Sequence, residues 1–318
     1  MKTISSRLGF GLSSIAGSGN RQHQERLIKT AIDAGITHFD VAPYYGSGDA
    51  EKILGSILKS CSEKVTITTK FGLVPLSGGL TGSLLRTALR PVFRQMRSLK
   101  QFASTIVRRT HQQKKLQFAK GDLLASIDAS IRNIGREVDI LLLHDTDITF
   151  SGNPDLLEEL ERIKSQGKTC FTGISGEADT VLTLVKSYPQ TYGVAQLENS
   201  LRRPAPVSQL LDSGASVITH RAIQGGLGEL RFLMKSRPKF MQVWNREIGI
   251  DATDNETIAG LLIELALFEN KGGPVLFSTT NPKHIRKVAS VLDSPRLREE
   301  EYLAVRSIFS ELYIEESE

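Results

Sequence analysis

The sequence predicts a closed (β/α)8 barrel, a TIM barrel, and three observations lead to this fold class. Eight apolar, strand-like runs follow one another, each followed by an amphipathic helical pattern or a long insertion. The runs are rich in β-branched residues and leucine, without clear alternation, as in strands that helices cover on both faces. The first run lacks a GxGxxG motif after it, which disfavours the open dinucleotide-binding sheet. We expect residues 1–318 to form one barrel domain.

The elements can be placed in order along the chain. The predicted strands cover residues 7–15, 37–42, 65–72, 138–145, 170–176, 193–200, 216–223 and 274–280. Amphipathic patterns predict connecting helices over residues 21–35, 122–135, 154–167 and 178–188. Gly35, Gly135 and Gly167 end three of these patterns, as the left-handed residue after a helix does. We expect loops, chiefly residues 73–118 and 226–250, to form the walls of any pocket.

The composition is that of a water-soluble protein from a reducing compartment. Hydrophobic residues make up 40% of the chain and charged residues 24%. Cys61 and Cys170 lie far apart and lack the spacing of a zinc site or a disulfide framework, so we expect no metal. No run approaches the roughly 18 apolar residues that span a bilayer. These features predict a cytoplasmic location.

A strongly basic insertion follows the third predicted strand. Between Val74 and Gly121 the chain has ten Lys or Arg residues and no Asp or Glu, whereas the remainder has 30 basic and 35 acidic residues. Residues 91–109 predict an amphipathic helix with four arginines: Arg94, Arg97, Arg108 and Arg109. Because the insertion follows a barrel strand, we expect residues 74–118 at the C-terminal face of the barrel.

Three interpretations of the basic helix remain open. It is a solvated helix on the barrel rim, a lid that attracts an anionic substrate, or a peripheral helix that lies on anionic lipid. Nucleic acid is the weakest candidate partner, because only Phe93 and Phe102 accompany the charges in the helix.

Side chains suited to chemistry recur at the predicted C-terminal ends of the strands, where barrel enzymes have their active sites. They are Asp40, Tyr45, Lys70, His144, Ser175, Gln196, His220 and Ser278. Taken singly they have ordinary explanations: Lys70 as a solvated strand end, His144 as a core histidine, and the neighbouring Asp145 as a helix N-cap. Their recurrence at equivalent positions favours one shared site.

The Asp, Tyr, Lys and His side chains together suit proton transfer to a carbonyl. An ammonium group lowers the pKa of a nearby phenol from its usual value of about 10, and a carboxylate holds the lysine in place. A histidine on the next strand can orient the carbonyl by a hydrogen bond. The set still requires a source of hydride.

These residues stand in motifs that resemble those of the aldo-keto reductase superfamily. The stretch FDVAPYYGSGDAEKILG resembles the family signature, TITTKFG its lysine strand and DILLLHD its histidine strand. The stretches FTGISG and VAQLENSL are similar to the strands that bind the nicotinamide carboxamide. The resemblance implies that Tyr45 is the general acid/base, that Lys70 and Asp40 tune it, and that His144 orients the carbonyl. Tyr44, one position earlier, is interpreted as a packing or pocket-wall residue.

The resemblance also implies a bound NADP(H), with NAD(H) as the alternative. Ser175 and Gln196 would hold the carboxamide, and His220 stands where an aromatic ring commonly stacks on the nicotinamide. Arg221 would reach a phosphate. The remaining expected cofactor contacts are Gly11, Leu12, Asp40, Ser278, Thr279, Thr280 and His284. One departure is Gly176, where the family usually has an asparagine.

The predicted function is therefore NADPH-dependent reduction of a carbonyl compound, or the reverse reaction on a sugar. The substrate would be a small aldehyde or ketone, either sugar-derived or anionic. The alternative is a regulatory or scaffold protein that keeps the barrel and binds the cofactor but turns over slowly. The departures at Gly176, at His220 and at Val288, where the family usually has an asparagine, favour this alternative. The intact set of Asp40, Tyr45, Lys70 and His144 opposes it.

Overall fold

The computed structural model describes residues 6–15, 20–72 and 121–315 of the chain. The basic insertion predicted over residues 74–118, with its helix over residues 91–109, lies outside the described residues.

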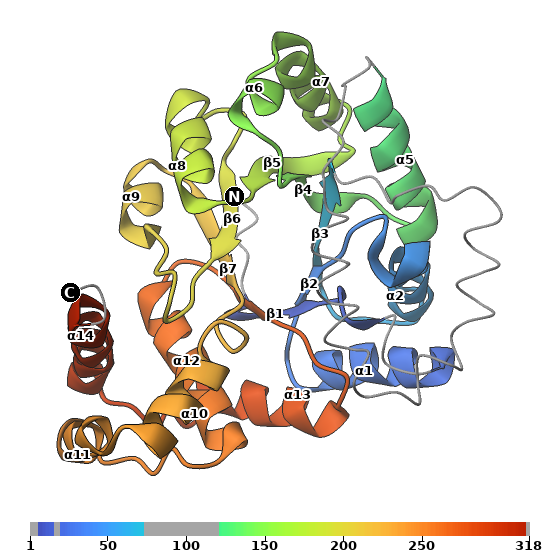
Figure 1. Cartoon of the computed structure of the whole chain (residues 1–318). Helices are drawn as coiled ribbons and strands as arrows, with labels where there is room; N and C mark the ends of the chain where they lie inside the picture. Colours follow the sequence, from blue (N-terminus) through green and yellow to red (C-terminus); the bar gives the residue numbers. More distant parts are fainter. Residues whose placement is uncertain (1–5, 16–19, 73–120, 316–318) are drawn as a thin grey trace, which may run out of the picture.

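The described strands form a closed, entirely parallel barrel in which each strand pairs with the next and β8 pairs with β1 (Figure 1). This confirms the predicted fold class. The strands are β1 (Leu8–Gly11), β2 (His38–Asp40), β3 (Thr66–Phe71), β4 (Val138–His144), β5 (Thr169–Ser175), β6 (Val194–Glu198), β7 (Ser216–His220) and β8 (Val275–Phe277).

Helices surround the barrel, and the four predicted from amphipathic patterns are present as α1, α5, α7 and α8 (Figure 1). The helices are α1 (Arg21–Asp33), α2 (Ala50–Leu58), α5 (Asp122–Ile134), α6 (Ile148–Ser151), α7 (Pro154–Ser165), α8 (Ala178–Ser187), α9 (Val207–Asp212), α10 (Leu227–Ser236), α11 (Pro238–Glu247), α12 (Asn255–Glu269), α13 (Pro282–Ala289) and α14 (Glu299–Glu315), with 3-10 turns η2 (Tyr45–Gly48) and η3 (Ser290–Leu292). Gly35, Gly135 and Gly167 have positive φ angles of 78°, 84° and 70°, as expected after a helix. Among the described residues, none of the helices combines the length and the apolar character needed to cross a bilayer.

Apolar residues pack on both faces of the barrel strands. The larger layer lies between the strands and the helices, and a smaller one is enclosed by the barrel itself. The enclosed cluster consists of Ile140, Leu142, Val194, Ile218 and Leu276. Because both faces of the strands are buried, the strands read as continuous apolar runs in the sequence.

The segment 226–250, expected to be a loop, is helical. It forms α10 and α11, which contribute Leu230, Leu233, Phe240 and Trp244 to a separate apolar cluster with α12 and α14. The expectation was wrong because helix-forming residues in this segment bury one face against neighbouring helices, a tertiary effect that the local pattern did not reveal.

Several strands end earlier than predicted. β4 stops at His144 and β7 at His220, because Asp145 and Arg221 have left-handed φ angles of 52° and 64° that end the extended backbone. The residues beyond these points therefore belong to the loops at the C-terminal face of the barrel.

Candidate active site

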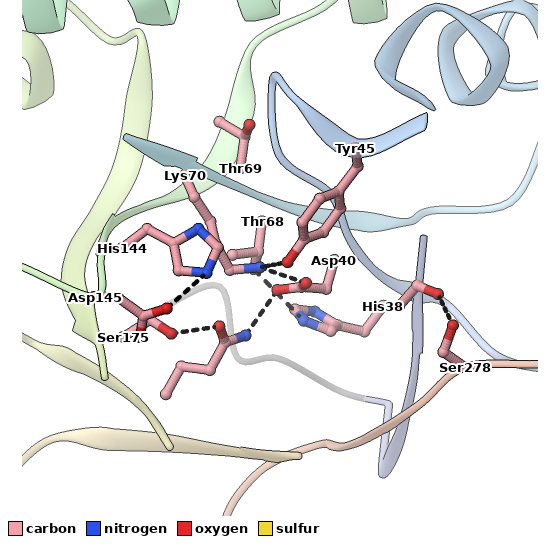
Figure 2. Close-up of polar contacts among 12 residues, drawn as sticks. His38, Asp40, Tyr45, Thr68, Thr69, Lys70, His144, Asp145, Ser175 and Ser278 are labelled. Carbon is pink, nitrogen blue, oxygen red and sulfur yellow. Dashed lines mark hydrogen bonds and ion pairs between the residues drawn. The ribbon is translucent and has the colours of Figure 1, made fainter. Parts of the chain in front are cut away.

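Five of the predicted side chains lie close together, as Figure 2 shows: Asp40, Tyr45, Lys70, His144 and Ser175. Parallel pairing aligns their positions: His144 pairs with Ser175, and Ser175 pairs with Gln196. Asp40, Lys70, Ser175 and Gln196 are nearly inaccessible to solvent. Asp40 and Gln196 are 156 positions apart in the chain and thus belong to one hydrogen-bonded cluster.

Lys70 connects the acid and the phenol at the centre of this cluster. Its ammonium donates a hydrogen bond to the Asp40 carboxylate, and its Nζ lies 3.4 Å from the Tyr45 hydroxyl oxygen. Tyr45 reaches this position because η2 begins directly after the loop that leaves β2. The Lys70 charge is buried but paired, which offsets much of the cost of removing it from water.

The pKa of Tyr45 differs from the expectation. Burial raises the pKa of the Tyr45 hydroxyl, and the Asp40 carboxylate raises it further, whereas a hydrogen bond from Tyr44 lowers it. The prediction of a lowered pKa was wrong. Lys70 is hydrogen-bonded to Asp40, and the loss of hydration of the Tyr45 hydroxyl outweighs the effect of the Lys70 charge. Tyr45 is therefore protonated at neutral pH and can donate a proton.

His144 is buried beside the phenols and is neutral. Burial lowers its pKa to about 2, with smaller contributions from the charges of Lys70 and His220. The Tyr44 hydroxyl oxygen lies 3.1 Å from His144 Nδ1, and the two rings are stacked with centroids 5.7 Å apart. Tyr44 is thus a wall of the site that contacts His144, consistent with its interpretation as a pocket-wall residue.

Asp145 is not a helix N-cap, contrary to its ordinary explanation. The cap of α6 is Asp147, whose side chain accepts a hydrogen bond of 2.7 Å from the backbone N–H of Phe150. Asp145 instead extends towards His144, with its Oδ2 3.7 Å from His144 Nε2. Spacing could have distinguished Asp145 from Asp147, because Asp147 directly precedes the helix.

Ser175 and Gln196 form a chain of hydrogen bonds that ends on Asp40. The Ser175 hydroxyl donates to Gln196 Oε1 over 2.9 Å, and Gln196 Nε2 donates to Asp40 Oδ2 over 2.7 Å. Asp40 therefore accepts from Lys70 on one oxygen and from Gln196 on the other. The amide keeps one further N–H and one carbonyl lone pair, which remain available to a ligand amide.

The residues expected near a phosphate lie around β8 and the start of α13. The Ser278 hydroxyl donates to the Gly11 carbonyl over 2.8 Å, and Ser278 and Thr280 are exposed. His284 is held by Thr279 Oγ1 at 3.3 Å and by Asn281 Nδ2 at 3.2 Å.

Leu12 does not reach the site. Its side chain is fully buried in the layer between barrel and helices, and its N–H and C=O bond to Asp40 and Ile15. We therefore remove Leu12 from the candidate contacts. Gly11 stays among them, because it lies beside Ser278 at the end of β1.

Comparison with known proteins identifies the family. Residues 7–309 match the model of the Aldo/keto reductase family. The chain belongs to the aldo/keto reductase family. An uncharacterized oxidoreductase of Bacillus subtilis is 28% identical over 180 residues, which are 55% of this chain and 50% of that protein. L-galactose dehydrogenase of Arabidopsis thaliana is 27% identical over 191 residues, 57% of this chain and 47% of that protein. The chain thus matches about half the length of these curated relatives.

Solved structures agree with this assignment at the level of the fold. An aldo-keto reductase from Klebsiella pneumoniae in complex with NADPH superposes with a TM-score of 0.65 and 18% identity, over 95% of this chain and 90% of that one.

The aldo/keto reductase family implies a nicotinamide dinucleotide, and the groups described here fit one. Ser175 and Gln196 keep unused hydrogen-bonding capacity for a carboxamide. Thr280 is exposed near the N-terminus of α13, where backbone N–H groups favour a phosphate. Ser278 is exposed as well, but its hydroxyl already donates to the Gly11 carbonyl and would have to leave it to bind a phosphate. Both ring nitrogens of His284 already have protein partners, so a phosphate would have to replace one of them.

The last residue of β7, His220, and the next residue, Arg221, fit the cofactor less directly. Burial lowers the pKa of His220 to about 4, so this ring is neutral and can stack. Arg221 Nη1 lies 3.2 Å from Glu198 Oε2, an ion pair that was not predicted from the sequence. Arg221 reaches a phosphate only if it leaves Glu198.

Sequence reasoning missed His38 in the interior of the barrel. His38 is fully buried one layer below Asp40, and its Nδ1 lies 2.9 Å from Thr66 Oγ1. The alternation of His38 and Asp40 on one strand was the available signal, because residues two apart face the same side.

Proposed function

We propose that this protein is an NADPH-using oxidoreductase that interconverts a small carbonyl compound and its alcohol, with Tyr45 as proton donor. One observation carries the proposal: the Tyr45 hydroxyl lies 3.4 Å from the Lys70 ammonium, which is itself bonded to Asp40. This arrangement supplies a buried proton donor together with a fixed positive charge that stabilises the phenolate left behind. NADPH is favoured over NADH because hydroxyls and a helix N-terminus lie where a further phosphate would bind.

Each of the site residues has a separate role in the proposed reaction. The nicotinamide, when bound, supplies or accepts the hydride. Tyr45 holds a proton on its hydroxyl oxygen and gives it to the carbonyl oxygen as that oxygen becomes an alkoxide. Lys70 stabilises the tyrosinate, and Asp40 keeps Lys70 in position. Neutral His144 donates its N–H to the carbonyl oxygen and orients the carbonyl.

The protonation of Tyr45 affects how each direction of the reaction depends on pH. Its raised pKa keeps the phenol protonated at neutral pH, which suits reduction. Oxidation of an alcohol requires the tyrosinate as base, so we expect oxidation to be favoured at alkaline pH. One relative is named L-galactose dehydrogenase. That name supports a sugar-derived substrate and its oxidation.

The test is direct observation of hydride transfer. The purified protein is mixed rapidly with NADPH and a set of small aldehydes, and loss of reduced-nicotinamide absorbance is followed. Thermal unfolding with NADPH, NADH or no nucleotide measures binding separately. We expect a larger thermal shift with NADPH and a rapid, aldehyde-dependent loss of absorbance. Binding without turnover for any aldehyde would instead support the regulatory or scaffold alternative.

A further inference from the structure

Two non-glycine residues in the described part of the chain have left-handed backbones, and both flank the candidate site. Asp145 has a φ angle of 52° and Arg221 one of 64°. Each directly follows the histidine that ends its strand, His144 in β4 and His220 in β7. Such backbones are uncommon for residues other than glycine and cluster at sites of function. The fold thus holds an acidic and a basic side chain at equivalent places on the barrel rim.

The backbone of Asp145 is fixed by the neighbouring strand. Its N–H donates a hydrogen bond of 2.8 Å to the Ser175 carbonyl. Its Oδ1 lies towards Gly176, where a Cβ atom would stand 3.8 Å from it. Its Oδ2 is directed towards the His144 ring at 3.7 Å from Nε2, as Figure 2 shows. The carboxylate is therefore aimed at the side chain that we expect to orient the carbonyl.

The Asp145 carboxylate has unused capacity to accept hydrogen bonds. Among the described residues, no group donates a hydrogen bond to it, and its side chain is 48% exposed. Burial raises the pKa of Asp145 and the charge of Arg221 lowers it, but Arg221 is itself paired with Glu198, with Nη1 3.2 Å from Oε2. An ionised carboxylate accepts but cannot donate, so its ligand must present an O–H or N–H group. An anionic group at this place would be repelled.

We propose that Asp145 accepts a hydrogen bond from a hydroxyl on the carbon next to the reacting carbonyl, so that the enzyme selects neutral hydroxyaldehydes and hydroxyketones, sugars included. This inference rests on the proposed function, because it places the carbonyl oxygen at His144. The carboxylate oxygen Oδ2 lies 3.7 Å from His144 Nε2, so we expect a hydroxyl on the carbon next to a carbonyl held by His144 to reach it. A plain aldehyde offers the carboxylate no hydrogen-bond donor, so the carboxylate does not favour its binding.

The test compares glyceraldehyde with propanal, which lacks the hydroxyls. Asp145→Gly deletes the carboxylate without straining the left-handed backbone, and Asp145→Asn keeps its shape but removes the charge. The measured quantity is the ratio of kcat/KM for glyceraldehyde to that for propanal. We expect this ratio to fall by about tenfold to a hundredfold in Asp145→Gly, the range for one hydrogen bond to a charged group, and by less in Asp145→Asn.

The matched control is Glu177→Gln, which removes a nearby negative charge that is 81% exposed and paired with Arg203. This variant should keep the wild-type ratio. A ratio unchanged in Asp145→Gly would overturn the inference while leaving the proposed function standing. Weaker NADPH binding by Asp145→Gly with an unchanged ratio would instead assign the carboxylate to the cofactor.

A second measurement does not depend on turnover. Lactamide and propanamide are unreactive carbonyl compounds with and without the adjacent hydroxyl, and their binding to the protein–NADPH complex is followed by nicotinamide fluorescence. We expect the wild type to prefer lactamide and Asp145→Gly to lose the preference. Equal binding of both amides by the wild type would contradict the inference. If neither aldehyde is reduced while the preference for lactamide is present, the proposed function fails and Asp145 still binds hydroxyl groups.

Discussion

At the scale of single residues, the proposed mechanism depends on one lysine that contacts both Asp40 and Tyr45. Lys70 is buried, bonded to Asp40 and 3.4 Å from Tyr45 Oη. Asp40 is in turn held by Gln196, so the ammonium has a fixed position. Because burial and Asp40 raise the pKa of Tyr45, the positive charge matters most when the proton has left and a tyrosinate has formed.

Lys70→Met should therefore impair the enzyme by destabilising the tyrosinate. We expect kcat to fall at least about a hundredfold, as for the loss of one group that stabilises developing charge. In the direction of alcohol oxidation, the rise of kcat with pH should move to higher pH, because the ammonium no longer favours ionisation of Tyr45. An active variant with the wild-type pH profile would remove Lys70 from the mechanism. Its thermal unfolding shows whether the variant is folded.

The identity of these residues was predictable, but their exact states were not. Asp40, Tyr45, Lys70, His144, Ser175 and Gln196 were all predicted from strand ends, and the structure brings them together. Their roles remain predictions. The protonation of Tyr45 depends on desolvation by residues distant in the sequence, so no local pattern reveals it. The left-handed backbone of Asp145 depends likewise on the loop that follows β4.

At the scale of elements, glycines inside the barrel let large side chains and the backbone of neighbouring strands come close. A Cβ atom at Gly173 in β5 would lie 2.0 Å from the Val194 carbonyl oxygen and 2.8 Å from Leu142 Cδ2. The sequence predicts the strand but not this requirement, because the contact joins three strands. Helix termini were more predictable, since caps such as Gly135 act within a few residues.

Gly173→Ala should destabilise the barrel, because the backbone carbonyl in the way belongs to a paired strand and cannot move aside. We expect a loss of about 1–3 kcal/mol in the free energy of unfolding, as for other overpacked cores. Gly193→Ala is the matched control just before β6, where no atom lies within 4 Å of the added Cβ. The free energy of unfolding of both variants is measured by urea denaturation. Equal stability of the two variants would show that β5 and β6 can separate at little cost.

At the scale of the whole molecule, buried histidines connect the stability of the barrel to pH. Burial lowers the pKa of His38 to about 4, of His144 to about 2 and of His220 to about 4. In the unfolded chain each titrates near its usual value of about 6.5. Between about pH 6.5 and pH 4 the unfolded state therefore binds more protons, and stability falls as the pH falls.

Each of these histidines should contribute a slope of up to about 1.4 kcal/mol per pH unit in that window. Asp145 and Glu264, whose pKa values burial raises, act in the opposite sense. Comparison of wild type with His38→Asn isolates one histidine. We expect urea unfolding at about pH 7 and about pH 5 to show a smaller loss of stability for the variant. Identical losses would mean that folding does not shift the pKa of His38.

The basic insertion yields a prediction from sequence alone, because Arg94, Arg97, Arg108 and Arg109 lie outside the described residues. If the helix attracts an anionic substrate, kcat/KM for that substrate should fall as salt shortens the Debye length from about 30 Å at 0.01 M to about 10 Å at 0.1 M. Replacing the four arginines with Gln should flatten this dependence, and a neutral aldehyde should show none. Salt dependence equal for charged and neutral aldehydes would contradict steering. Loss of binding to anionic vesicles with unchanged turnover would favour the lipid interpretation.

The most direct test of the account compares Tyr45→Phe with Tyr44→Phe in a single turnover with saturating NADPH. The two phenols are adjacent in sequence and their rings are 5.0 Å apart, yet only Tyr45 has its hydroxyl at Lys70. We expect Tyr45→Phe to slow hydride transfer by about 10²–10⁴, the usual effect of losing a general acid, while NADPH binding is kept. Tyr44→Phe should retain most of the rate. Full activity in Tyr45→Phe, with the loss in Tyr44→Phe instead, would contradict the assignment of the proton donor.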